Sequence, residues 1–512
     1  RLLRPGGARR PIGWIGIVLG VVAAASLTHS ILLTPDNPAA AYFVTTTRAW
    51  EFGAGAMLVL LMRRFAPPSG ALVPLRYAGL ALLVGTAMTI SQATPFPGWV
   101  ALGPVLGTAA IILAGDCDGR DPLGVLFTMR PAQWLGDISY SIYLWHWPLI
   151  VFAPYAVHGE LRVRHKVAIV ALTLLLAHLS KRYVEDATAY LPKVKASTRR
   201  SLLMAAGSMA VVAALASGQI AWSNASQDRH QSDVAASLTK PCYGAAARLG
   251  TVKCPDAFTA APSFVVGTSE APWGAEYGCV VDPEGLSPVL CRAPDPSRPK
   301  RIIALVGDSH AQQYEFPIRE YAALENWEVR MWFKGGCQTS YADAKGLEGR
   351  VRKPPDTCPP WVRSVSANLA KIKPDVIVTS SFAGAYDYAS TDAAVAGYRA
   401  LWSEWTAYAK VVVIRDQAET LRTVMPQCLA QHPGDHEACS RPRAAALKPD
   451  PMMIAAQQMA GSGVSFVDFS DAYCDATTCH SVVGTVPIYY DRDHLTRTVA
   501  RSLAPFLFPY LR

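Results

Sequence analysis

The stretch RIIALVGDSHAQQYEFPIREYAAL, from Arg301 to Leu324, decides how the C-terminal part of the chain folds. Residues 302–306 form a short continuous apolar run, which is typical of a strand buried on both faces. The tetrapeptide GDSH (307–310) ends this run, and residues 311–324 carry apolar side chains at helical spacing. Such a turn places Ser309 at the carboxyl edge of a sheet, where backbone N–H groups can stabilise an oxyanion. The alternative is that Ser309 only caps the helix.

A second motif, DRDHL at 491–495, lies near the end of the chain. A strand is predicted before it, over 485–490, and a helix is predicted after it, from Thr496. A carboxylate three residues before a histidine can hold one ring nitrogen while the other nitrogen accepts a proton from a serine. Asp491 has this offset from His494, whereas Asp493 is adjacent in sequence and is predicted to face elsewhere. The alternative is a polar surface turn.

Strand-like and helix-like segments alternate from Arg301 onward. This alternation predicts an α/β domain of three layers, with a parallel, flavodoxin-like sheet and a site at the carboxyl ends of its strands. The predicted strands are 302–306, 328–333, 375–379, 410–414 and 464–469.

GDSH at the start and DxxH at the end of one α/β domain resemble the SGNH hydrolase family. The resemblance implies a catalytic triad of Ser309, His494 and Asp491. The ordinary pKa of a histidine side chain is about 6.5. If the pKa of His494 is unperturbed, activity is expected near or above about pH 6.5.

The resemblance also implies an oxyanion hole. A glycine N–H after the second strand belongs to it in the family, which points to Gly335 or Gly336, with a plain Gly-Gly turn as the alternative. The asparagine that the family places after the third strand is absent. Ser380 or Ser381, in VTSSF at 378–382, is the substitute that we consider.

Composition separates the chain into two halves. Of the 512 residues, 51% are apolar and 17% are charged, and the apolar stretches concentrate before residue 224. The formal charge of +9 therefore indicates membrane topology rather than a nucleic-acid partner. An all-α bundle of membrane-spanning helices is predicted, with spans at 12–34, 41–62, 72–92, 98–115, 134–156, 166–184 and 201–222.

Basic residues lie mainly on one side of these spans. Arg162, Arg164 and Lys166 fall on the other side, and four basic segments outweigh them. By the positive-inside rule the residues after the last span lie outside the cytoplasm, which predicts a bacterial inner-membrane protein with a periplasmic C-terminal domain. The four segments contain Arg1, Arg4, Arg9 and Arg10; Arg63, Arg64 and Arg76; Arg120 and Arg130; and Lys193, Lys195, Arg199 and Arg200.

Polar residues inside the spans add a second resemblance. Arg48 and Glu51 of RAWE are three residues apart, so they are predicted to share a helix face, either as an ion pair that joins helices or as part of a site. His146 lies in SYSIYLWHWP and is either a packing residue or part of that site. These stretches resemble membrane-bound acyltransferases of family 3, which include O-antigen and peptidoglycan O-acetyltransferases.

The second resemblance implies that the membrane domain is partial. Family members have about ten core spans, and the chain, which begins at Arg1, is expected to lack the first of them. The predicted domains are 1–190, the partial acyltransferase domain; 191–223, a linker with an additional transmembrane helix; 224–300, an irregular extracytoplasmic extension; and 301–512, the SGNH-like domain.

The cysteines indicate an oxidising compartment. Of eleven, only Cys117 precedes residue 224, and the others form sequence-close couples. These couples predict disulfides rather than a metal site, since none has the CxxC spacing typical of zinc ligands. The couples are Cys242 and Cys254, Cys279 and Cys291, Cys337 and Cys358, Cys428 and Cys439, and Cys474 and Cys479.

Together these features predict an envelope O-acyltransferase, most simply an O-acetyltransferase. The membrane bilayer, a cell-envelope polysaccharide acceptor and an acyl donor are its expected partners. Acetyl-CoA is the expected donor, and no bound cofactor is expected. The first alternative is an extracytoplasmic carbohydrate esterase that uses the same triad. The second is a membrane-anchored, non-catalytic glycan-binding domain.

Overall fold

A computed structural model of the protein describes most of the chain. The described residues are 11–36, 38–63, 68–91, 94–115, 121–157, 161–186, 197–274, 279–280, 289–292, 294–295, 297–346, 358–420 and 423–512. Several residues considered above lie outside them, namely Arg1, Arg4, Arg9, Arg10, Arg64, Cys117, Arg120, Lys193 and Lys195. Residues 1–144 and 174–184 form one compact unit, and residues 145–173 and 185–512 form another.

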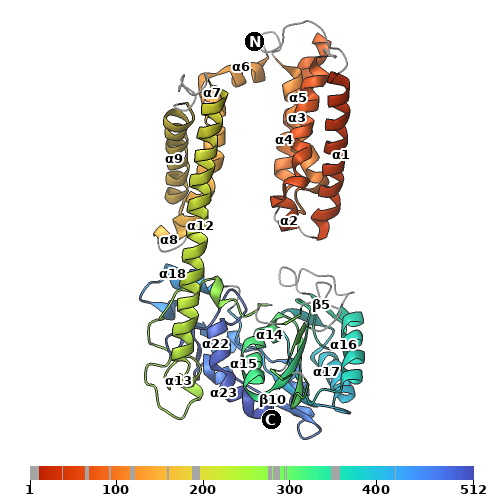
Figure 1. The fold of residues 1–512 in the computed structure, drawn as a ribbon, viewed down its shortest axis with the longest axis vertical. Coiled ribbons are helices and arrows are strands. Elements are labelled where there is room, and N and C mark those ends of the chain that lie inside the picture. Colours follow the sequence, from red (N-terminus) through yellow and green to blue (C-terminus); the bar gives the residue numbers. More distant parts are fainter. Residues whose placement is uncertain are drawn as a thin grey trace. The chain divides into compact units, whose positions relative to one another are not determined.

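Four of the predicted spans are helices long and apolar enough to cross a bilayer. Large apolar side chains along the last of them are exposed, as expected for a helix that faces lipid; Leu202 and Trp222 have exposures of 65% and 63%. The four helices are α1 (Pro11–Asp36), α4 (Ser69–Thr89), α9 (Val163–Ser180), which a π-helical turn (Lys181–Glu185) continues, and α12 (Thr198–Ser237) (Figure 1).

The other three predicted spans are divided. Within 41–62, the hydroxyl of Thr47 donates to the carbonyl oxygens of Ala41 and Val44, so hydrogen bonds to the backbone stabilise a break. Apolar composition predicts the extent of such a segment, but side-chain hydrogen bonds of this kind interrupt the helix within it. The pieces are α2 (Pro38–Phe43), η1 (Thr45–Thr47) and α3 (Ala49–Met62); η2 (Gly98–Ala101) and α5 (Leu102–Ala114); and α7 (Arg130–Asp137) and α8 (Ser139–Val157).

The sequence analysis counted Arg76 in a basic segment between spans, and this prediction is wrong. Arg76 lies within α4, where its side chain is almost fully buried and its Nη1 donates to Asp121 Oδ2 at 2.8 Å. The same carboxylate oxygen caps α6 (Pro122–Thr128) by accepting the Gly124 N–H at 3.1 Å. Arg76 therefore joins two helices of the membrane half and does not count toward its topology.

Helix α12 continues beyond residue 223, where the irregular extension was predicted to begin. It runs to Ser237 because the segment 224–237 contains neither glycine nor proline and is rich in alanine and polar residues compatible with a helix. The hydropathy of the helix changes near Trp222, but its backbone does not.

The polar end of α12 is attached to the chain that follows it. His230 Nε2 lies 2.6 Å from Oε1 of Glu270, whose side chain is fully buried. Gln231 Nε2 donates to the carbonyl oxygen of Ser269 at 3.1 Å. These contacts join the helix to the short 3₁₀ element η4 (Thr268–Glu270).

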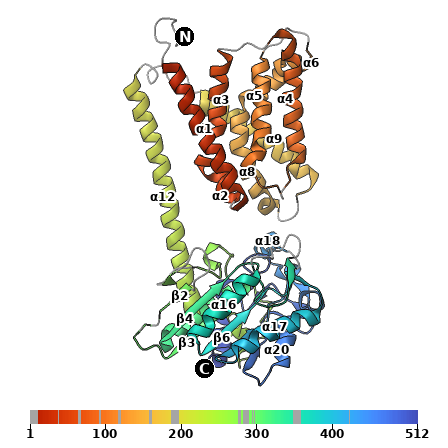
Figure 2. The same ribbon diagram turned by 90° about the vertical axis from the view of Figure 1, so that its right-hand side faces the viewer.

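The C-terminal domain is built on a seven-stranded sheet, in the order β1-β2-β4-β3-β6-β8-β10 (Figure 2). The pairs from β4 to β10 are parallel, and their order confirms the predicted flavodoxin-like sheet. Antiparallel β1 and β2 extend it at one edge, so this part of the predicted irregular extension is ordered as strands. The strands are β1 (Cys279–Val280), β2 (Val289–Cys291), β3 (Arg301–Gly307), β4 (Trp327–Phe333), β6 (Val376–Ser380), β8 (Lys410–Ile414) and β10 (Val464–Val467).

Two apolar cores lie on opposite faces of the sheet. Side chains of β3 alternate between them, with Ile303 and Leu305 in one core and Ala304 and Val306 in the other. One core is covered by α15 (Glu315–Glu325), α22 (Arg497–Ser502) and α23 (Ala504–Leu507) (Figure 1). The other is covered by α16 (Cys358–Ile372), α17 (Thr391–Trp405) and α20 (Pro451–Gln458) (Figure 2). The result is the predicted three-layer arrangement.

Two local predictions differ from the structure. The strand predicted over 485–490 is only the second arm of a short hairpin of β12 (Val482–Val483) and β13 (Val486–Pro487), because Gly484 and Thr485 adopt positive φ values and turn the chain. The helix predicted over 311–324 is divided into α14 (Ser309–Gln312) and α15. The remaining elements are α13 (Ala246–Leu249), β5 (Ala344–Gly346), β7 (Tyr386–Tyr388), α18 (Met425–Gln431), η6 (His436–Cys439), β9 (Arg441–Pro442), α19 (Arg443–Ala446), α21 (Ser470–Tyr473), β11 (Thr478–Cys479) and η7 (Phe508–Tyr510).

Disulfide bonds follow the predicted couples. Cys279 and Cys291 face each other as Cα partners between β1 and β2, and the Cys279 side chain lies outside the described residues. Nearest-neighbour pairing is confirmed for Cys242–Cys254, Cys337–Cys358, Cys428–Cys439 and Cys474–Cys479.

Candidate active site

Ser309 stands where β3 turns into α14. The preceding Asp308 is the N-cap, because its Oδ1 accepts the N–H of His310 at 2.9 Å, so Ser309 is not the cap itself. Gly307 makes the turn fit, since a Cβ there would lie 2.4 Å from both the Ala311 Cβ and the Ser380 carbonyl oxygen. A residue without a side chain thus allows Ser309 to project from the sheet edge, half-buried.

The loop that carries His494 is closed by Asp491. Its Oδ1 accepts the backbone N–H groups of Asp493 at 3.0 Å and His494 at 2.9 Å. The Tyr490 N–H donates to the carbonyl oxygen of His494 at 2.8 Å. Hydrogen bonds within the motif therefore fix the backbone that presents the imidazole.

The structure brings the three predicted triad residues together. His494 Nε2 lies 2.8 Å from Ser309 Oγ, and His494 Nδ1 lies 2.9 Å from Asp491 Oδ2. This is the order of contacts through which an aspartate orients a histidine to accept a serine proton. The expectation for Asp493 is wrong, because its Oδ1 lies 3.0 Å from the same Nδ1. The turn at Asp491 bends the loop enough for both carboxylates to reach the ring.

These carboxylates control the charge of the imidazole. Burial alone would lower the pKa of His494, but hydrogen bonds and charge from Asp491 and Asp493 raise the pKa to about 10. Burial would raise the pKa of Asp491, yet the hydrogen bond and charge of His494 hold it well below its ordinary value. The pKa of His494 is thus perturbed upward from the ordinary value assumed in the sequence analysis.

The predicted oxyanion donors lie on the turn after β4. The Lys334 N–H donates to the carbonyl oxygen of Gly307 at 3.1 Å, which holds this turn beside the end of β3. Gly336 has a φ of 73°, a value that favours glycine, and Gly335 is exposed with no atom within 4 Å of a hypothetical Cβ. Gly335 therefore leaves room for a ligand, and the role of either glycine as a donor stays a prediction.

The two suggested serine substitutes differ in their surroundings. Ser381 Oγ donates to Asp308 Oδ2 at 3.1 Å, and the same oxygen accepts from the Phe382 N–H and the Tyr386 hydroxyl, each at 2.8 Å. Ser380 is fully buried, and its hydroxyl has no hydrogen-bond partner among the described residues. The hydroxyl of Ser381 therefore helps to hold the capping aspartate in place, and a role of either serine as an oxyanion donor stays a prediction.

A second histidine–aspartate pair, which the sequence analysis missed, lies behind the triad. His310 is 1% exposed, its Nδ1 lies 2.6 Å from Asp416 Oδ1, and its ring centroid lies 4.9 Å from that of His494. Burial raises the pKa of Asp416. Burial would lower the pKa of His310, but the charge and hydrogen bond of Asp416 raise it. The GDSH motif signals the histidine, but nothing local to it signals a partner on the exit of β8.

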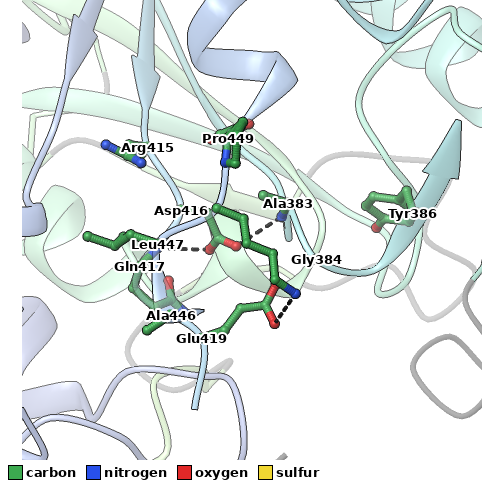
Figure 3. A pocket seen from close by; sticks show the side chains of 12 residues that line it. Ala383, Gly384, Tyr386, Arg415, Asp416, Gln417, Glu419, Ala446, Leu447 and Pro449 are labelled. Carbon is green, nitrogen blue, oxygen red and sulfur yellow. Dashed lines mark hydrogen bonds and ion pairs between the residues drawn. The ribbon is translucent and has the colours of Figure 1, made fainter. Parts of the chain in front are cut away.

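Asp416 also forms the wall of a cavity of about 220 Å³ (Figure 3). The cavity lies at the same edge of the sheet as Ser309, because the segments after β6 and β8 line it. Figure 3 shows the Asp416 carboxylate against the N–H of Ala383, to which it is bonded at 2.9 Å. Asp450 lines the cavity as well, and burial raises its pKa to about 7.

Trp273 is a further residue to which the sequence analysis gave no role. Its ring centroid lies 4.8 Å from that of His494, with the two rings nearly perpendicular at 82°. It also lies edge to face with Tyr490, at 5.5 Å. The residue belongs to the extension that precedes the SGNH-like domain, where no sequence pattern marks it.

Potential metal ligands occur in two groups within the described part of the chain. Atoms of His310, Asp493 and His494 lie within 4.8 Å of one another. His494 already uses both ring nitrogens, toward Asp491 and Ser309. The other group is Cys428, His432 and Cys439, whose sulfurs form a disulfide and so offer no thiolate.

Residues 278–509 match the family described as "SGNH domain (fused to AT3 domains)". The C-terminal domain is an SGNH domain. The match includes both the strand–turn–helix unit that carries Ser309 and the loop that carries His494. These two segments meet at one edge of the sheet, where His494 contacts Ser309.

Relatives of the chain carry the names of O-acetyltransferases. The chain is 30% identical over 181 residues to the peptidoglycan O-acetyltransferase OatA of Listeria monocytogenes, and the aligned region covers 33% of this chain and 29% of the relative. It is 28% identical over 208 residues to the O-acetyltransferase OatA of Staphylococcus aureus, with coverage of 36% and 34%. The chain spans about half or less of the length of the curated relatives it matches.

One solved structure is similar to part of the chain. It is the periplasmic domain of a lipopolysaccharide acetyltransferase from Salmonella ser. Paratyphi A, with 13% identity and a TM-score of 0.33, covering 41% of this chain and 83% of that one.

The four long apolar helices and the relatives above make the chain a membrane protein.

Arg48, Glu51 and His146, the candidate site residues of the membrane half, lie on helices α3 and α8 or at their ends. Arg48 Nε lies 3.4 Å from Glu51 Oε1 at the start of α3, which confirms that the two share a face. Both line a cavity of about 330 Å³ together with Thr108 of α5. His146 lies on α8 and is half-buried. The part that these residues play in acyl transfer stays a prediction.

Proposed function

We propose that the protein is an O-acyltransferase that transfers an acyl group, most simply acetyl, to a hydroxyl of a cell-envelope polysaccharide. The observation that carries this proposal is the continuous chain of contacts from Asp491 through His494 to Ser309 in an SGNH domain attached to membrane-spanning helices. The names of the relatives, peptidoglycan O-acetyltransferase and O-acetyltransferase, support transfer over simple hydrolysis.

In the first half of the proposed reaction, Ser309 Oγ attacks the carbonyl carbon of the donor ester or thioester while His494 Nε2 accepts the serine proton. The tetrahedral intermediate collapses to the acyl-serine ester, and His494 returns the proton to the leaving group. Backbone N–H groups at Ser309 and Gly335 or Gly336 would stabilise the oxyanion.

In the second half, a sugar hydroxyl takes the place of the leaving group. His494 accepts its proton, the hydroxyl oxygen attacks the acyl-serine carbonyl, and the proton returns to Ser309 Oγ as the sugar ester departs. Water in the same place would release free acid. The outcome thus depends on how well the acceptor sugar is held beside His494.

The membrane half would deliver the acyl group. We propose an inner-membrane location with a periplasmic SGNH domain and acetyl-CoA as the cytoplasmic donor. Arg48 and Glu51, which line a cavity among the membrane helices, are candidates for contact with the acyl carrier. Exposed apolar side chains along α12 support the membrane location.

The test uses the full chain in detergent micelles with 4-nitrophenyl acetate as donor and an oligosaccharide as acceptor. Ser309→Ala should lower nitrophenolate release by at least about a thousand-fold, because the nucleophile is removed. Ser403→Ala, at an exposed position of α17, is the matched control and should retain wild-type activity. Mass spectrometry of the products gives the ratio of sugar ester to free acid.

Turnover that survives in Ser309→Ala would contradict the proposed nucleophile. Free acetate as the sole product at saturating oligosaccharide would instead favour the esterase alternative. A domain that binds oligosaccharide but releases no nitrophenolate would favour the non-catalytic glycan-binding alternative.

A further inference from the structure

We propose that Trp273 is the acceptor platform of the active site, on which a pyranose ring of the acceptor glycan stacks while its hydroxyl is presented to His494. The inference rests on the proposed acyl transfer and names the part of the site that holds the sugar. It assigns a binding role to a residue outside the core of the α/β fold.

The segment around Trp273 is bonded to the SGNH domain on both sides of the ring. Before it, the carbonyl oxygen of Ala271 accepts from Arg497 Nε at 3.0 Å. After it, the carbonyl oxygen of Gly274 accepts from Arg319 Nη1 at 3.3 Å. These hydrogen bonds hold the backbone on both sides of Trp273, and the indole itself packs against His494 and Tyr490.

A buried carboxylate anchors the same segment. Glu270 is fully buried, and its two oxygens accept the N–H of Thr498 at 2.9 Å and the Thr498 hydroxyl at 2.8 Å. Burying a carboxylate is unfavourable unless hydrogen bonds satisfy it, as they do here. The chain thus uses charged and buried groups to fix a half-exposed tryptophan beside the triad.

Exposure distinguishes Trp273 from the other tryptophans of the domain. It is half-buried, so part of its ring surface remains open to a ligand. The remaining tryptophans after Trp222 are at most 4% exposed and belong to the two cores: Trp327, Trp332, Trp361, Trp402 and Trp405. Packing therefore accounts for them and leaves the half-exposed ring of Trp273 without the same explanation.

The location suits a sugar. A hydroxyl that gives its proton to His494 must come within about 3 Å of Nε2. The indole centroid lies 4.8 Å from the imidazole centroid, so the ring that carries this hydroxyl would come within contact distance of the indole. The flat apolar face of tryptophan matches the C–H face of a pyranose, while the sugar hydroxyls remain free for hydrogen bonds.

Such a platform would favour sugar over water at the acyl-serine. Water gains nothing from an indole face, whereas a stacked pyranose is held with its hydroxyl near the base. The identity of the residue at 273 should therefore change the choice between acceptors. An open-chain alcohol such as glycerol has no ring to stack and provides the comparison.

The experiment measures the ratio of sugar ester to glycerol ester formed by the full chain in detergent micelles. The donor is 4-nitrophenyl acetate, and chitotetraose and glycerol compete as acceptors. In Trp273→Ala and Trp273→Leu the ratio should fall by at least about ten-fold, while Trp273→Phe should remain within about three-fold of wild type because it retains an aromatic face. Leucine tests whether apolar bulk alone is sufficient.

Two controls separate recognition from misfolding. Labelling of Ser309 by a fluorophosphonate counts the molecules with an intact nucleophile, and rates are divided by that count. Tyr510→Ala removes an aromatic ring that is 37% exposed near the C-terminus, and it should leave the ratio unchanged.

Binding is measured separately from turnover. Saturation-transfer NMR with chitotetraose on the Ser309→Ala chain should give a signal that disappears in Ser309→Ala/Trp273→Ala. A ratio unchanged in Trp273→Ala, a leucine variant equal to wild type, or an equal fall for both acceptors would overturn the proposal. Ester turnover that persists in Ser309→Ala would refute the proposed function, while the NMR comparison would still decide the role of Trp273.

Discussion

Asp493→Asn removes one of the two carboxylates that face a single ring nitrogen of His494. Nδ1 lies 2.9 Å from Asp491 Oδ2 and 3.0 Å from Asp493 Oδ1. Asp491 also accepts two backbone N–H groups, so it holds both the loop and the ring. Removal of the Asp493 charge should therefore lower the pKa of His494 while the imidazole keeps its orientation.

The size of the change follows from distance and exposure. Two unit charges about 4 Å apart interact by about 1 kcal/mol in water and about 4 kcal/mol at an effective dielectric constant of about 20. The Asp493 side chain is 32% exposed, which places the pair toward the weaker end. We take about 1.4 kcal/mol, which corresponds to about one pKa unit for His494.

The sign of the effect on the rate is determined by the role of the base. Only the unprotonated imidazole accepts the serine proton, so below the pKa of about 10 the rate rises about ten-fold per pH unit. In Asp493→Asn this rise should occur about one pH unit lower. Activity at pH 7 should increase by up to about ten-fold, less the loss from a weaker base.

The assay is the pH dependence of kcat/KM for nitrophenolate release, from about pH 6 to about pH 10. Asp491→Asn is the contrasting variant and should lose about two to four orders of magnitude, because it removes the group that orients the ring. A rising limb that stays in place in Asp493→Asn, or that moves toward alkaline pH, would refute the assignment of the raised pKa to Asp493.

Three further substitutions test the scaffold. The Asp308 carboxylate accepts hydrogen bonds from His310, Ser381, Phe382 and Tyr386, and Asp308→Asn would replace one of its oxygens with an N–H group that cannot accept them. This substitution should lower the free energy of unfolding by about 3 kcal/mol and slow fluorophosphonate labelling. Cys337→Ser with Cys358→Ser should lower the same free energy by about 2–4 kcal/mol, measured by denaturant against the reduced and oxidised wild type. Arg76→Met should destabilise the membrane half by about 3–5 kcal/mol in a thermal unfolding assay, because the buried Asp121 carboxylate loses its counter-charge and keeps only its capping hydrogen bond from Gly124, and adding Asp121→Leu should restore most of the loss.

Features that depend on neighbouring residues could be predicted from the sequence. The continuous apolar run of β3 specifies a buried strand, and the five parallel strands all occur where such runs were found. The contact of His494 with Asp491 spans three residues and follows from the turn. The disulfides also join cysteines close in sequence, where few alternatives compete.

Features that depend on distant partners could not be predicted. His310 and Asp416 are 106 residues apart, and a single sequence carries no signal that pairs them. The segment of Trp273 is held beside His494 by hydrogen bonds from Arg497 and Arg319, among others, which no local pattern indicates. The break between α2 and α3 was missed for a different reason: it is local, but hydropathy does not register the hydrogen bonds from the Thr47 hydroxyl to the carbonyl oxygens of Ala41 and Val44.

Because α12 is continuous, its length sets both the distance of the SGNH domain from the apolar part of the helix and the rotation of the domain about the helix axis. Apolar residues end near Trp222, and Gln231 already bonds to the backbone at Ser269, so the domain is attached within a few helical turns of the apolar surface. Each residue inserted between these points would raise the attachment by about 1.5 Å and swing it about 100° around the helix axis. An insertion of a whole number of turns would therefore preserve the direction in which Ser309 faces relative to the apolar part of α12, and an insertion of half a turn would reverse it.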